Sequence, residues 1–405
     1  MRWFVMPVVL IVAAAALAGD WPQWLGPNRN GSTAETIKPW TGSPKELWKA
    51  PVGEGHSSPV VVGGRVFLLT KVAGKDEEQL SIFDATTGKD LGTSVQPRKP
   101  FSSIFGVGPR ATPLVTADGQ VITLGVTGNL NVQTPARNWI VDVLETNAAP
   151  NLRFGTSASP LQVDDKVVVM PGGKGAGLVA YNRSDGKVVW KSLDDPASYA
   201  SPILIEQAGQ KLIVALTADG VVAVQPSDGA LVWRYPFKDG LSESSTTPVV
   251  VGDKLIVSSI TLGTTALKLI ARDGKPAIEK LWDQPHLTCY FSTPVAVGDD
   301  IYLATGRMMP PASMTLHCVD VATGNVRWSQ KNVGKYHTAL LRTGDQKLLM
   351  HSDNGNLALI QPNPKEYQEL CKAKICGETW AHPAIANGRV YVRDEKNLIC
   401  VQVGE

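Results

Sequence analysis

The sequence has little of what marks several large protein classes. Its five cysteines are too few, and odd in number, for the disulfide framework of a small exported protein. Thirty-nine Lys and Arg residues against 37 Asp and Glu residues leave a net charge of only +2, which provides no electrostatic attraction for nucleic acid or anionic lipid. With 43% hydrophobic and 19% charged residues, the composition fits neither a disordered chain nor a polytopic membrane protein. We therefore expect no nucleic acid partner and no integral membrane segment in the mature chain.

Motifs of common catalytic and metal sites are also missing. The six histidines are scattered without a pair at helix-ligand spacing, and no Gly-x-Ser-x-Gly elbow occurs, so zinc and serine hydrolases lack support. The run 172–175 resembles a phosphate loop, but no Ser or Thr follows Lys174, and a hairpin turn explains it. We therefore predict no catalytic residue of these types.

The cysteines are expected to be mainly structural. Cys318 and Cys400 lie inside apolar runs, where a thiol serves as a small core side chain. Cys371 and Cys376 could pair locally or form half of a zinc site, but no second ligand pair follows at a zinc-finger interval. We therefore predict no metal site and leave the pairing of these two cysteines open.

The first 18 residues differ from the rest of the chain. Arg2 precedes an apolar stretch that is shorter than the roughly 20 residues needed to span a bilayer, and small residues at 16–18 suit a cleavage site. This pattern predicts a signal peptide at 1–18, with an uncleaved N-terminal anchor as the alternative. Asp20 stands where a bacterial lipobox requires Cys, which argues against lipidation. We expect a periplasmic or secreted protein.

One pattern recurs along the remaining chain. A Ser/Thr step ending in Pro leads into an apolar run, a Gly/Asp turn, two further apolar runs, a polar turn with Gly, and a Trp; the clearest copy spans 292–328. The opening prolines stand at 59, 113, 160, 202, 248, 294 and 383, and Ala339 takes the missing place. The resulting period of near 45 residues is typical of a four-stranded propeller blade.

The two ends of the repeat complete each other. The last unit opens at His382 and ends near Val401 without a fourth strand, whereas the segment around Trp48 resembles a fourth strand with no blade before it. Pairing the two would remove the open sheet edges. We predict an all-β, eight-bladed β-propeller of four-stranded antiparallel blades over 46–405, acting as a monomer and preceded by a leader segment at 19–45. Seven blades with irregular ends is the rival count.

The repeat resembles a known family. Its apolar run, Asp-Ala-x-Thr-Gly turn and Trp are similar over residues 46–401 to the quinoprotein-like β-propeller repeat, named for pyrroloquinoline quinone (PQQ) dehydrogenases. The run from Asp20 to Gly31 resembles the leader of exported bacterial members, notably of planctomycete type. The family divides between quinone dehydrogenases and catalytically silent propellers similar to the accessory protein of the outer-membrane β-barrel assembly machine, so the resemblance alone does not decide function.

The features that the resemblance implies for a quinoenzyme are absent from this sequence. Such enzymes carry two adjacent cysteines over the quinone and a calcium site with a catalytic Asp, whereas no two of the five cysteines are neighbours here and the calcium ligands have no equivalent segment. We therefore expect a non-catalytic scaffold without a cofactor that binds a protein or another component of the cell envelope. The alternatives are a PQQ- and calcium-dependent dehydrogenase or degenerate quinone binder, and an extracellular carbohydrate-binding propeller.

Aligning the blades reveals two columns at the start of the innermost strands. The residue before each opening proline is almost always a hydroxyl, which we expect to bond local backbone: Ser58, Thr112, Ser159, Ser201, Thr247, Thr293, Thr338 and His382. Two residues earlier, on the same face, the column varies: His56, Arg110, Ser157, Tyr199, Ser245, Phe291, Tyr336 and Trp380.

The variable column is where we expect function. Aromatic and Arg side chains at the mouth of a central channel are favoured for binding. The predicted ligand or partner site consists of His56, Arg110, Tyr199, Phe291, Tyr336, Trp380 and His382. The alternative is that bulky side chains merely plug the axis of the ring.

Overall fold

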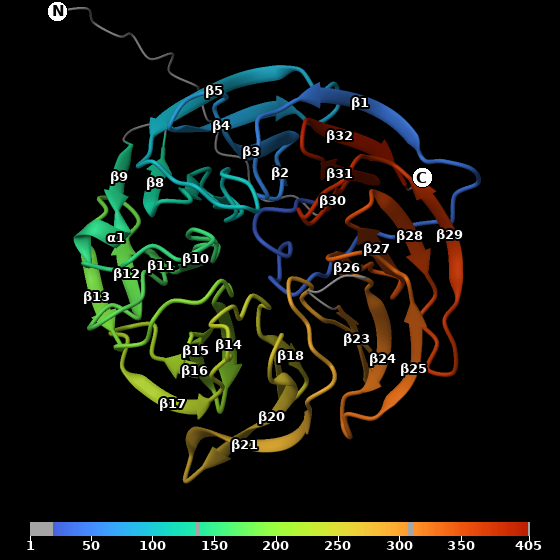
Figure 1. The fold of residues 1–405 in the computed structure, drawn as a ribbon. Helices are drawn as coiled ribbons and strands as arrows, with labels where there is room; N and C mark the ends of the chain where they lie inside the picture. The colour runs from blue at the N-terminus through green and yellow to red at the C-terminus, as the bar shows by residue number, and fades with distance from the viewer. Residues whose placement is uncertain (1–18, 135–137, 307–311, 404–405) are drawn as a thin grey trace, which may run out of the picture.

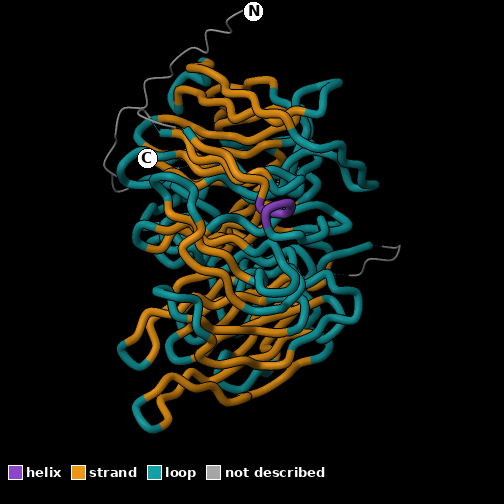
Figure 2. The backbone as a smooth tube through the Cα atoms, turned by 90° about the vertical axis from the view of Figure 1, so that its left-hand side faces the viewer, coloured by secondary structure: helices purple, strands orange, loops and turns teal. Residues whose placement is uncertain are grey.

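The computed structural model describes residues 19–134, 138–306 and 312–403, so the predicted signal peptide at 1–18 lies outside the described residues. Eight four-stranded antiparallel sheets are arranged as blades around a central axis (Figure 1). The described residues contain one short helix, α1 (Val143–Thr146), which Figure 2 shows among strands and loops. The all-β, eight-bladed prediction is confirmed, and the seven-blade rival is wrong.

The first four blades follow the chain in order. Blade 1 holds β2 (Val60–Val62), β3 (Arg65–Lys71), β4 (Glu77–Asp84) and β5 (Asp90–Pro97). Blade 2 holds β6 (Leu114–Val115), β7 (Val121–Leu124), β8 (Asn129–Gln133) and β9 (Trp139–Asp142). Blade 3 holds β10 (Leu161–Val163), β11 (Lys166–Val169), β12 (Leu178–Asn182) and β13 (Val188–Ser192). Blade 4 holds β14 (Ile203–Gln207), β15 (Gln210–Leu216), β16 (Gly220–Val224) and β17 (Leu231–Pro236).

The last four blades continue the ring and return to its start. Blade 5 holds β18 (Val249–Val251), β19 (Lys254–Ser259), β20 (Gly263–Arg272) and β21 (Lys275–Gln284). Blade 6 holds β22 (Val295–Val297), β23 (Asp300–Thr305), β24 (Thr315–Asp320) and β25 (Val326–Lys331). Blade 7 holds β26 (Thr338–Arg342), β27 (Leu348–Ser352), β28 (Asn356–Ile360) and β29 (Glu369–Lys374). Blade 8 holds β30 (Ala384–Ala386), β31 (Arg389–Arg393), β32 (Asn397–Gln402) and the N-terminal β1 (Lys45–Pro51).

Blade 8 is closed by the N-terminal strand, as predicted. β1 pairs antiparallel with β32, and Trp48 stands opposite Cys400. Because the two ends of the chain share one sheet, opening the ring would require breaking backbone hydrogen bonds as well as side-chain contacts.

The opening prolines set where the innermost strands begin. In seven blades the strand starts at the residue after Pro, as at Val60 after Pro59. Blade 7 has Ala339 instead, and β26 starts earlier, with Thr338 opposite Ser352. The physical reason is that Pro has no N–H to donate to the ladder, whereas Ala does.

Tryptophans of the fourth strands dock onto the closing turn of the next blade. The indole Nε1 of Trp139 donates to the carbonyl of Arg183 at 3.0 Å, and Gly186 lies under the ring with a φ of +72°. A Cβ at Gly186 would come within 2.7 Å of that ring. The same Trp–Gly pairing recurs between blades at Trp48 and Gly88, Trp190 and Gly229, and Trp282 and Gly324. We name these four contacts the girdle, and they explain why the repeat keeps Gly and Trp.

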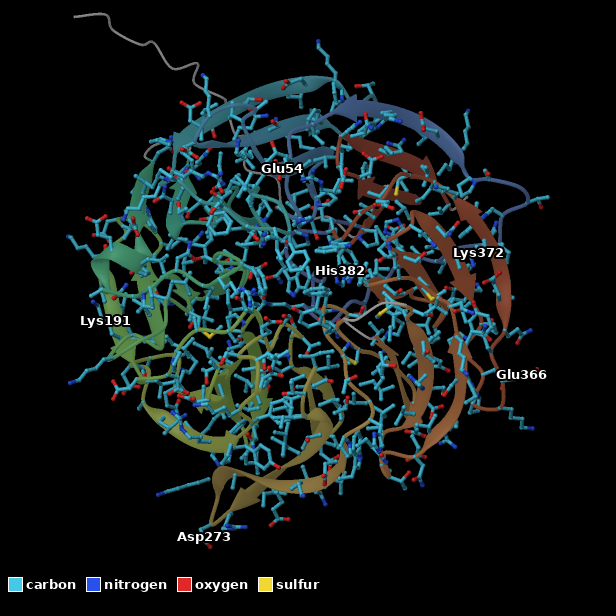
Figure 3. The ribbon with its side chains drawn as sticks, viewed as in Figure 1. Glu54, Lys191, Asp273, Glu366, Lys372 and His382 are labelled. Atoms are coloured by element: carbon cyan, nitrogen blue, oxygen red, sulfur yellow. The ribbon has the colours of Figure 1, made fainter. Side chains whose placement is uncertain are left out.

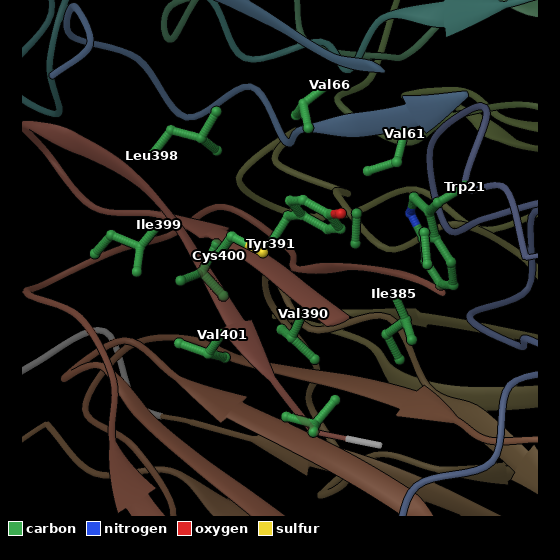
Figure 4. Packing of buried hydrophobic residues seen from close by; sticks show 14 of the residues in the cluster. Trp21, Val61, Val66, Ile385, Val390, Tyr391, Leu398, Ile399, Cys400 and Val401 are labelled. Atoms are coloured by element: carbon green, nitrogen blue, oxygen red, sulfur yellow. The ribbon is translucent and has the colours of Figure 1, made fainter. Parts of the chain in front are cut away.

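The leader segment runs into the ring, an arrangement that sequence reasoning did not predict. Trp21 exchanges two backbone hydrogen bonds with Val61 and is 1% exposed, packed near Ile385 in a core cluster (Figure 4). The blue N-terminal segment in Figure 1 loops into the centre of the propeller.

Arg29 fixes the leader on the axis. Its guanidinium donates to the carbonyls of Ser159, Pro160 and Pro202, at 2.6, 3.0 and 2.7 Å. Burial lowers the pKa of Arg29 to about 9, yet the side chain stays cationic at neutral pH and satisfies carbonyls that begin two neighbouring blades. The leader is therefore part of the core.

The cysteines are free thiols, including Cys371 and Cys376, whose possible pairing does not occur. The Cys371 sulfur accepts the backbone N–H of Trp40, and the Cys376 sulfur lies 3.4 Å from Nε2 of His351. Cys318 and Cys400 are buried core residues, as predicted. Within the described ranges, no helix is long and apolar enough to cross a membrane.

Candidate binding site on the propeller axis

The hydroxyl column mainly joins neighbouring blades rather than bonding local backbone. The N–H of Thr112 donates to the Ser159 hydroxyl at 2.9 Å, that of Ser159 to Ser201 at 2.9 Å, and that of His382 to Ser58 at 3.0 Å. Five of the seven hydroxyls accept an N–H from the blade before them, because adjacent innermost strands approach closely on the axis; for these five the expected local bond is wrong. The other two differ: Thr247 accepts the indole N–H of Trp24, and Thr338 bonds local backbone as predicted, by donating to the carbonyl of Val333 at 3.1 Å.

All eight members of the variable column come together around the axis, where they line two cavities. The axial cavity has a volume of about 140 Å³ and is bounded on one side by Trp24 of the leader. The mouth cavity has a volume of about 620 Å³ and lies at one end of the axis, near Glu54. Figure 3 shows Glu54 and His382, which line the mouth and the axial cavity respectively, near the centre of the ring.

An aromatic partition separates the two cavities. Five side chains line both: His56, Phe105, Tyr290, Phe291 and Trp380. Trp380 is their hub, because its ring stacks on His56 at 5.3 Å and on Phe291 at 5.5 Å between centroids. The predicted plug and the predicted binding surface are thus one structure: the rings that close the channel form the floor of the mouth cavity.

His56 and Arg110 hold the loop 98–110 at the rim. The His56 Nε2 lies 2.9 Å from the carbonyl of Phe105, and Arg110 donates to the carbonyls of Phe105, Gly106 and Gly108 at 2.8–3.1 Å. Burial, and then the charge of Arg110, lowers the pKa of His56 to about 4. Neutral His56 must therefore donate through Nε2, because a carbonyl only accepts. Both side chains hold the rim of the mouth cavity in place.

A buried ion pair supports the base of the same loop. Glu78 is fully buried and lies 3.5 Å from the guanidinium of Arg98, which also donates to the carbonyl of Val107. Burial raises the pKa of Glu78, and its carboxylate accepts the backbone N–H of Val126 at 3.1 Å. Removing one member of such a pair strands the other charge and costs about 3–5 kcal/mol, so the loop is firmly held.

The mouth cavity combines an aromatic floor with an acidic and apolar rim. Four carboxylates line it against one ammonium: Glu54, Glu378, Asp394 and Glu395 against Lys396. Tyr336 stands at the edge of the floor, with its ring 6.4 Å from that of Trp380. Ile104 also lines this cavity and is 81% exposed. Ile104 therefore adds apolar surface beside the aromatic floor of the mouth cavity.

The axial cavity is more polar than a core void. Tyr290 donates its hydroxyl to the Glu243 carboxylate, which is 7% exposed. Trp24 donates its indole N–H to the Thr247 hydroxyl at 2.8 Å, and its ring packs 4.6 Å from that of His382. The ring centroids of His337 and His382 lie 5.1 Å apart. Burial lowers the pKa of His337 to about 3 and that of His382 well below its usual value. Both imidazoles are therefore neutral at neutral pH.

Several residues of the site were not predicted. Trp24, Phe105, Phe154, Glu243, Tyr290 and His337 all line the axial cavity. Tyr290 directly precedes the column residue Phe291, and His337 directly follows the column residue Tyr336. A strict two-residue period would therefore turn both side chains away from the axis. The approach to each innermost strand is irregular, which breaks that period. For Trp24, the signal available in the sequence was the Trp-Pro-Gln-Trp run of the leader.

The buried thiols and imidazoles do not supply an activated nucleophile or base. Burial raises the pKa of Cys376 to about 12 and lowers that of its neighbour His351 to about 3, so neither ionises near neutral pH. Among residues that the structure describes, no three or more His, Cys, Asp or Glu side chains converge as a metal site.

The donors around the axis also fit a quinone with calcium poorly. The five cysteines are separate free thiols, so none forms a vicinal pair over the mouth cavity. The four carboxylates that line this cavity would repel PQQ, which itself carries carboxylate groups. The residues around the axis therefore do not form a site suited to a quinone with calcium.

An eight-bladed ring with a leader sealed into its axis defines the chain as a closed β-propeller. A family model described as outer membrane protein assembly factor BamB matches residues 76–330 and 279–403, and the chain belongs to this family of PQQ-like propellers. A search of curated proteins finds no significant match.

Solved structures share the fold at low sequence identity. BamB from Moraxella catarrhalis is 14% identical, with a TM-score of 0.61 over 89% of this chain and 98% of that chain. Quinohemoprotein alcohol dehydrogenase from Comamonas testosteroni is 12% identical, with a TM-score of 0.69 over 98% of this chain and 83% of that chain. The computationally designed Ika8 protein is 10% identical, with a TM-score of 0.56 over 88% of this chain and 99% of that chain. An assembly factor, an alcohol dehydrogenase and a designed protein share this architecture, so function must be argued from the site.

Proposed function

We propose that the protein is a non-catalytic scaffold of the cell envelope that binds a protein partner on the face around the mouth cavity. The observation that carries the proposal is the mouth cavity itself, about 620 Å³, with an aromatic floor and with Ile104 81% exposed at its side. Interfaces concentrate binding energy in aromatic and apolar groups at their centre, surrounded by polar groups.

The rim is built to bind without rearranging. His56 and Arg110 hold the carbonyls of the loop 98–110, and the buried Arg98–Glu78 pair holds its base. A surface that is ordered beforehand loses less conformational entropy on association. Membership of the BamB family supports a protein partner, and the predicted signal peptide supports a periplasmic or secreted location. Because the ring closes on its own N-terminal strand, we propose that it acts as a monomer.

The test is site-specific cross-linking in intact cells, comparing Ile104→Asp with Leu91→Asp. Leu91 is an exposed apolar residue on the outer strand β5, 42% exposed, and serves as the matched control. We expect Ile104→Asp to reduce the yield of one reproducible protein cross-link by about tenfold, corresponding to roughly 1.4 kcal/mol. Leu91→Asp should leave that yield unchanged, and both variants should melt near the wild-type temperature. Equal yields from the two variants would place the interface elsewhere.

A quinone-dependent dehydrogenase is the alternative; quinohemoprotein alcohol dehydrogenase shares its fold with this chain, but the separate cysteines and the carboxylates of the mouth cavity do not favour it. Titrating quinone with calcium while following tryptophan fluorescence distinguishes it. Saturable quenching with turnover of an alcohol would support an enzyme, and no saturable change would count against it. The carbohydrate-binding alternative is weaker, because the ring of Trp380 already stacks on those of its neighbours His56 and Phe291. A glycan array would test it directly.

A further inference from the structure

The axial cavity contains a buried carboxylate without a cationic partner. Glu243 is 7% exposed, and its side chain accepts the hydroxyl of Tyr290. None of the ion pairs within the described ranges involves Glu243. A carboxylate taken out of water without a counter-charge is unfavourable, so a cation beside Glu243 would be stabilised in this cavity.

His337 is a second polar group without a partner that lines the axial cavity. It is 2% exposed, and neither of its ring nitrogens has a hydrogen-bond partner. Since burial keeps the imidazole neutral, it offers one N–H donor and one lone pair. Unpaired buried imidazole nitrogens are unfavourable, and both Glu243 and His337 line this cavity.

The remaining wall is largely aromatic. Trp24, Tyr290, Phe291 and Trp380 line the cavity, and aromatic rings attract cations through their negative faces. Arg110 also lines it, but its guanidinium is hydrogen-bonded to three loop carbonyls and forms no ion pair with Glu243. The need for a positive charge near Glu243 therefore remains.

We propose that the axial cavity binds an alkylammonium group, which pairs with the Glu243 carboxylate, donates to the free nitrogen of His337 and lies against the aromatic wall. The source is either a free primary amine or the end of a lysine side chain from a partner that docks on the mouth. The lysine source rests on the proposed function, whereas the free amine does not.

Size and access agree with this group. A cavity of about 150 Å³ accommodates benzene, which has six non-hydrogen atoms. The axial cavity, at about 140 Å³, is therefore large enough for the five non-hydrogen atoms of n-butylammonium, which also match the end of a lysine. The path from outside is the aromatic partition, whose members His56, Phe105, Phe291 and Trp380 are only half-buried and line both cavities. The carboxylates at the mouth attract cations toward that path.

The experiment titrates the full mature chain with n-butylammonium, n-butanol and butyrate, followed by calorimetry and by the fluorescence of the tryptophans beside the cavity. We expect saturable binding of the amine that is at least about tenfold tighter than that of the alcohol, and no binding of the acid. Glu243→Gln keeps an oxygen for Tyr290 but removes the charge, so it should abolish the preference for amine over alcohol. The matched control Glu366→Gln changes an exposed carboxylate at the periphery of the ring (Figure 3) and should change amine affinity less than twofold.

Folding and source are controlled separately. Tyr290→Phe keeps the charge of Glu243 and should keep amine binding, and melting curves of all variants show that they fold. A short peptide containing lysine, compared with the same peptide containing norleucine, distinguishes the two sources. Lysine-dependent peptide binding assigns a partner side chain, and binding of butylammonium alone assigns a free amine. Equal affinities for amine and alcohol, or an unchanged preference in Glu243→Gln, would overturn the inference, while the Ile104→Asp result would still decide the scaffold proposal independently.

Discussion

The outer girdle and the central axis of this propeller follow opposite rules. In the girdle, one contact is repeated: a Trp of one blade covers the Gly of the next, with a Gly φ between +70° and +75° at four places. On the axis, eight equivalent positions hold basic, aromatic and small polar residues. Repetition in the girdle secures the ring, and this leaves the axis free to vary. We infer that the outer radius of the blades carries stability, and we propose that the inner radius carries recognition.

Four of the eight joints between blades have the Trp–Gly contact, and the joint between blades 4 and 5 shows how another is made. In blade 5 the strands β20 and β21 have ten residues each and meet at the tight turn of Asp273 and Gly274, and Asp273 lies at the periphery in Figure 3. Trp233 of blade 4 donates instead to the side chain of Gln207 at 2.9 Å, and Gln207 donates to the carbonyls of Ile270 and Ala277. The joint between blades is thus kept even without the Trp–Gly contact, because Gln207 relays the hydrogen bond.

The strongest test of the comparison is Trp282→Ala in the girdle. Trp282 is 8% exposed and donates to the carbonyl of Val321 at 2.9 Å. We expect the free energy of unfolding to fall by about 3–5 kcal/mol, as for other buried aromatic truncations. Urea unfolding would measure it, with Leu281→Ala as the control, since Leu281 is 40% exposed on the same strand. A loss below about 1 kcal/mol would show that the girdle is not the main fastening.

Two glycine substitutions separate backbone strain from the Trp contact. Gly324 and Gly274 have φ values of +75° and +71°, but a Cβ at Gly324 would come within 2.7 Å of Trp282, whereas nothing lies within 4 Å of one at Gly274. Both Ala variants carry a left-handed penalty of about 1–2 kcal/mol. The free energy of unfolding of Gly324→Ala should fall by roughly 1–3 kcal/mol more, because the added methyl group overpacks against Trp282. If thermal unfolding shows equal losses of stability in the two variants, the repeated glycine geometry is required by the turn alone and not by the docking of Trp282.

The buried histidines of the axis should make stability depend on pH. The folded pKa values of His337 and His351 are lowered to about 3, whereas an unfolded histidine titrates near 6.5. As pH falls below 6.5, the unfolded chain takes up protons that the folded chain does not, so stability is lost between pH 6.5 and 3. Each such histidine should cost about 2 kcal/mol by pH 5.

Replacing His337 tests this dependence. His337→Gln should reduce the loss of unfolding free energy between pH 7.5 and pH 5 by about 2 kcal/mol. Urea unfolding at the two pH values measures the loss, and His286→Gln controls for removing a histidine from the surface. An unchanged loss in His337→Gln would mean that its imidazole is protonated in the folded state.

The fold was more predictable than the site, for a physical reason. The period and the turn residues are local patterns, so the blades could be counted along the chain. The pairing of Trp48 with the last blade is long-range, but it followed from a unit without a fourth strand and a fourth strand without a unit. Arg29 and Trp24 bond residues more than 120 positions away and belong to no repeat, so nothing local indicated that they seal the axis. The variable column followed from register, but Glu243 and Phe105 come from irregular loops, where side-chain direction depends on tertiary contacts.

The smallest expected effect lies on the axis and compares two serines of one blade that line the same cavity. Ser159 accepts the N–H of Thr112 at 2.9 Å, so Ser159→Ala leaves a buried donor unpaired and should cost about 1–2 kcal/mol. Ser157 belongs to the variable column, and its buried hydroxyl has no hydrogen-bond partner. Ser157→Ala should therefore be neutral or stabilising by up to about 1 kcal/mol, because it removes an unsatisfied polar group. Paired urea titrations resolve that difference. A destabilised Ser157→Ala would show that the variable column stabilises the ring as well as shaping its mouth. Stability and recognition would then be divided between neighbouring residues of one blade rather than between its outer and inner radii.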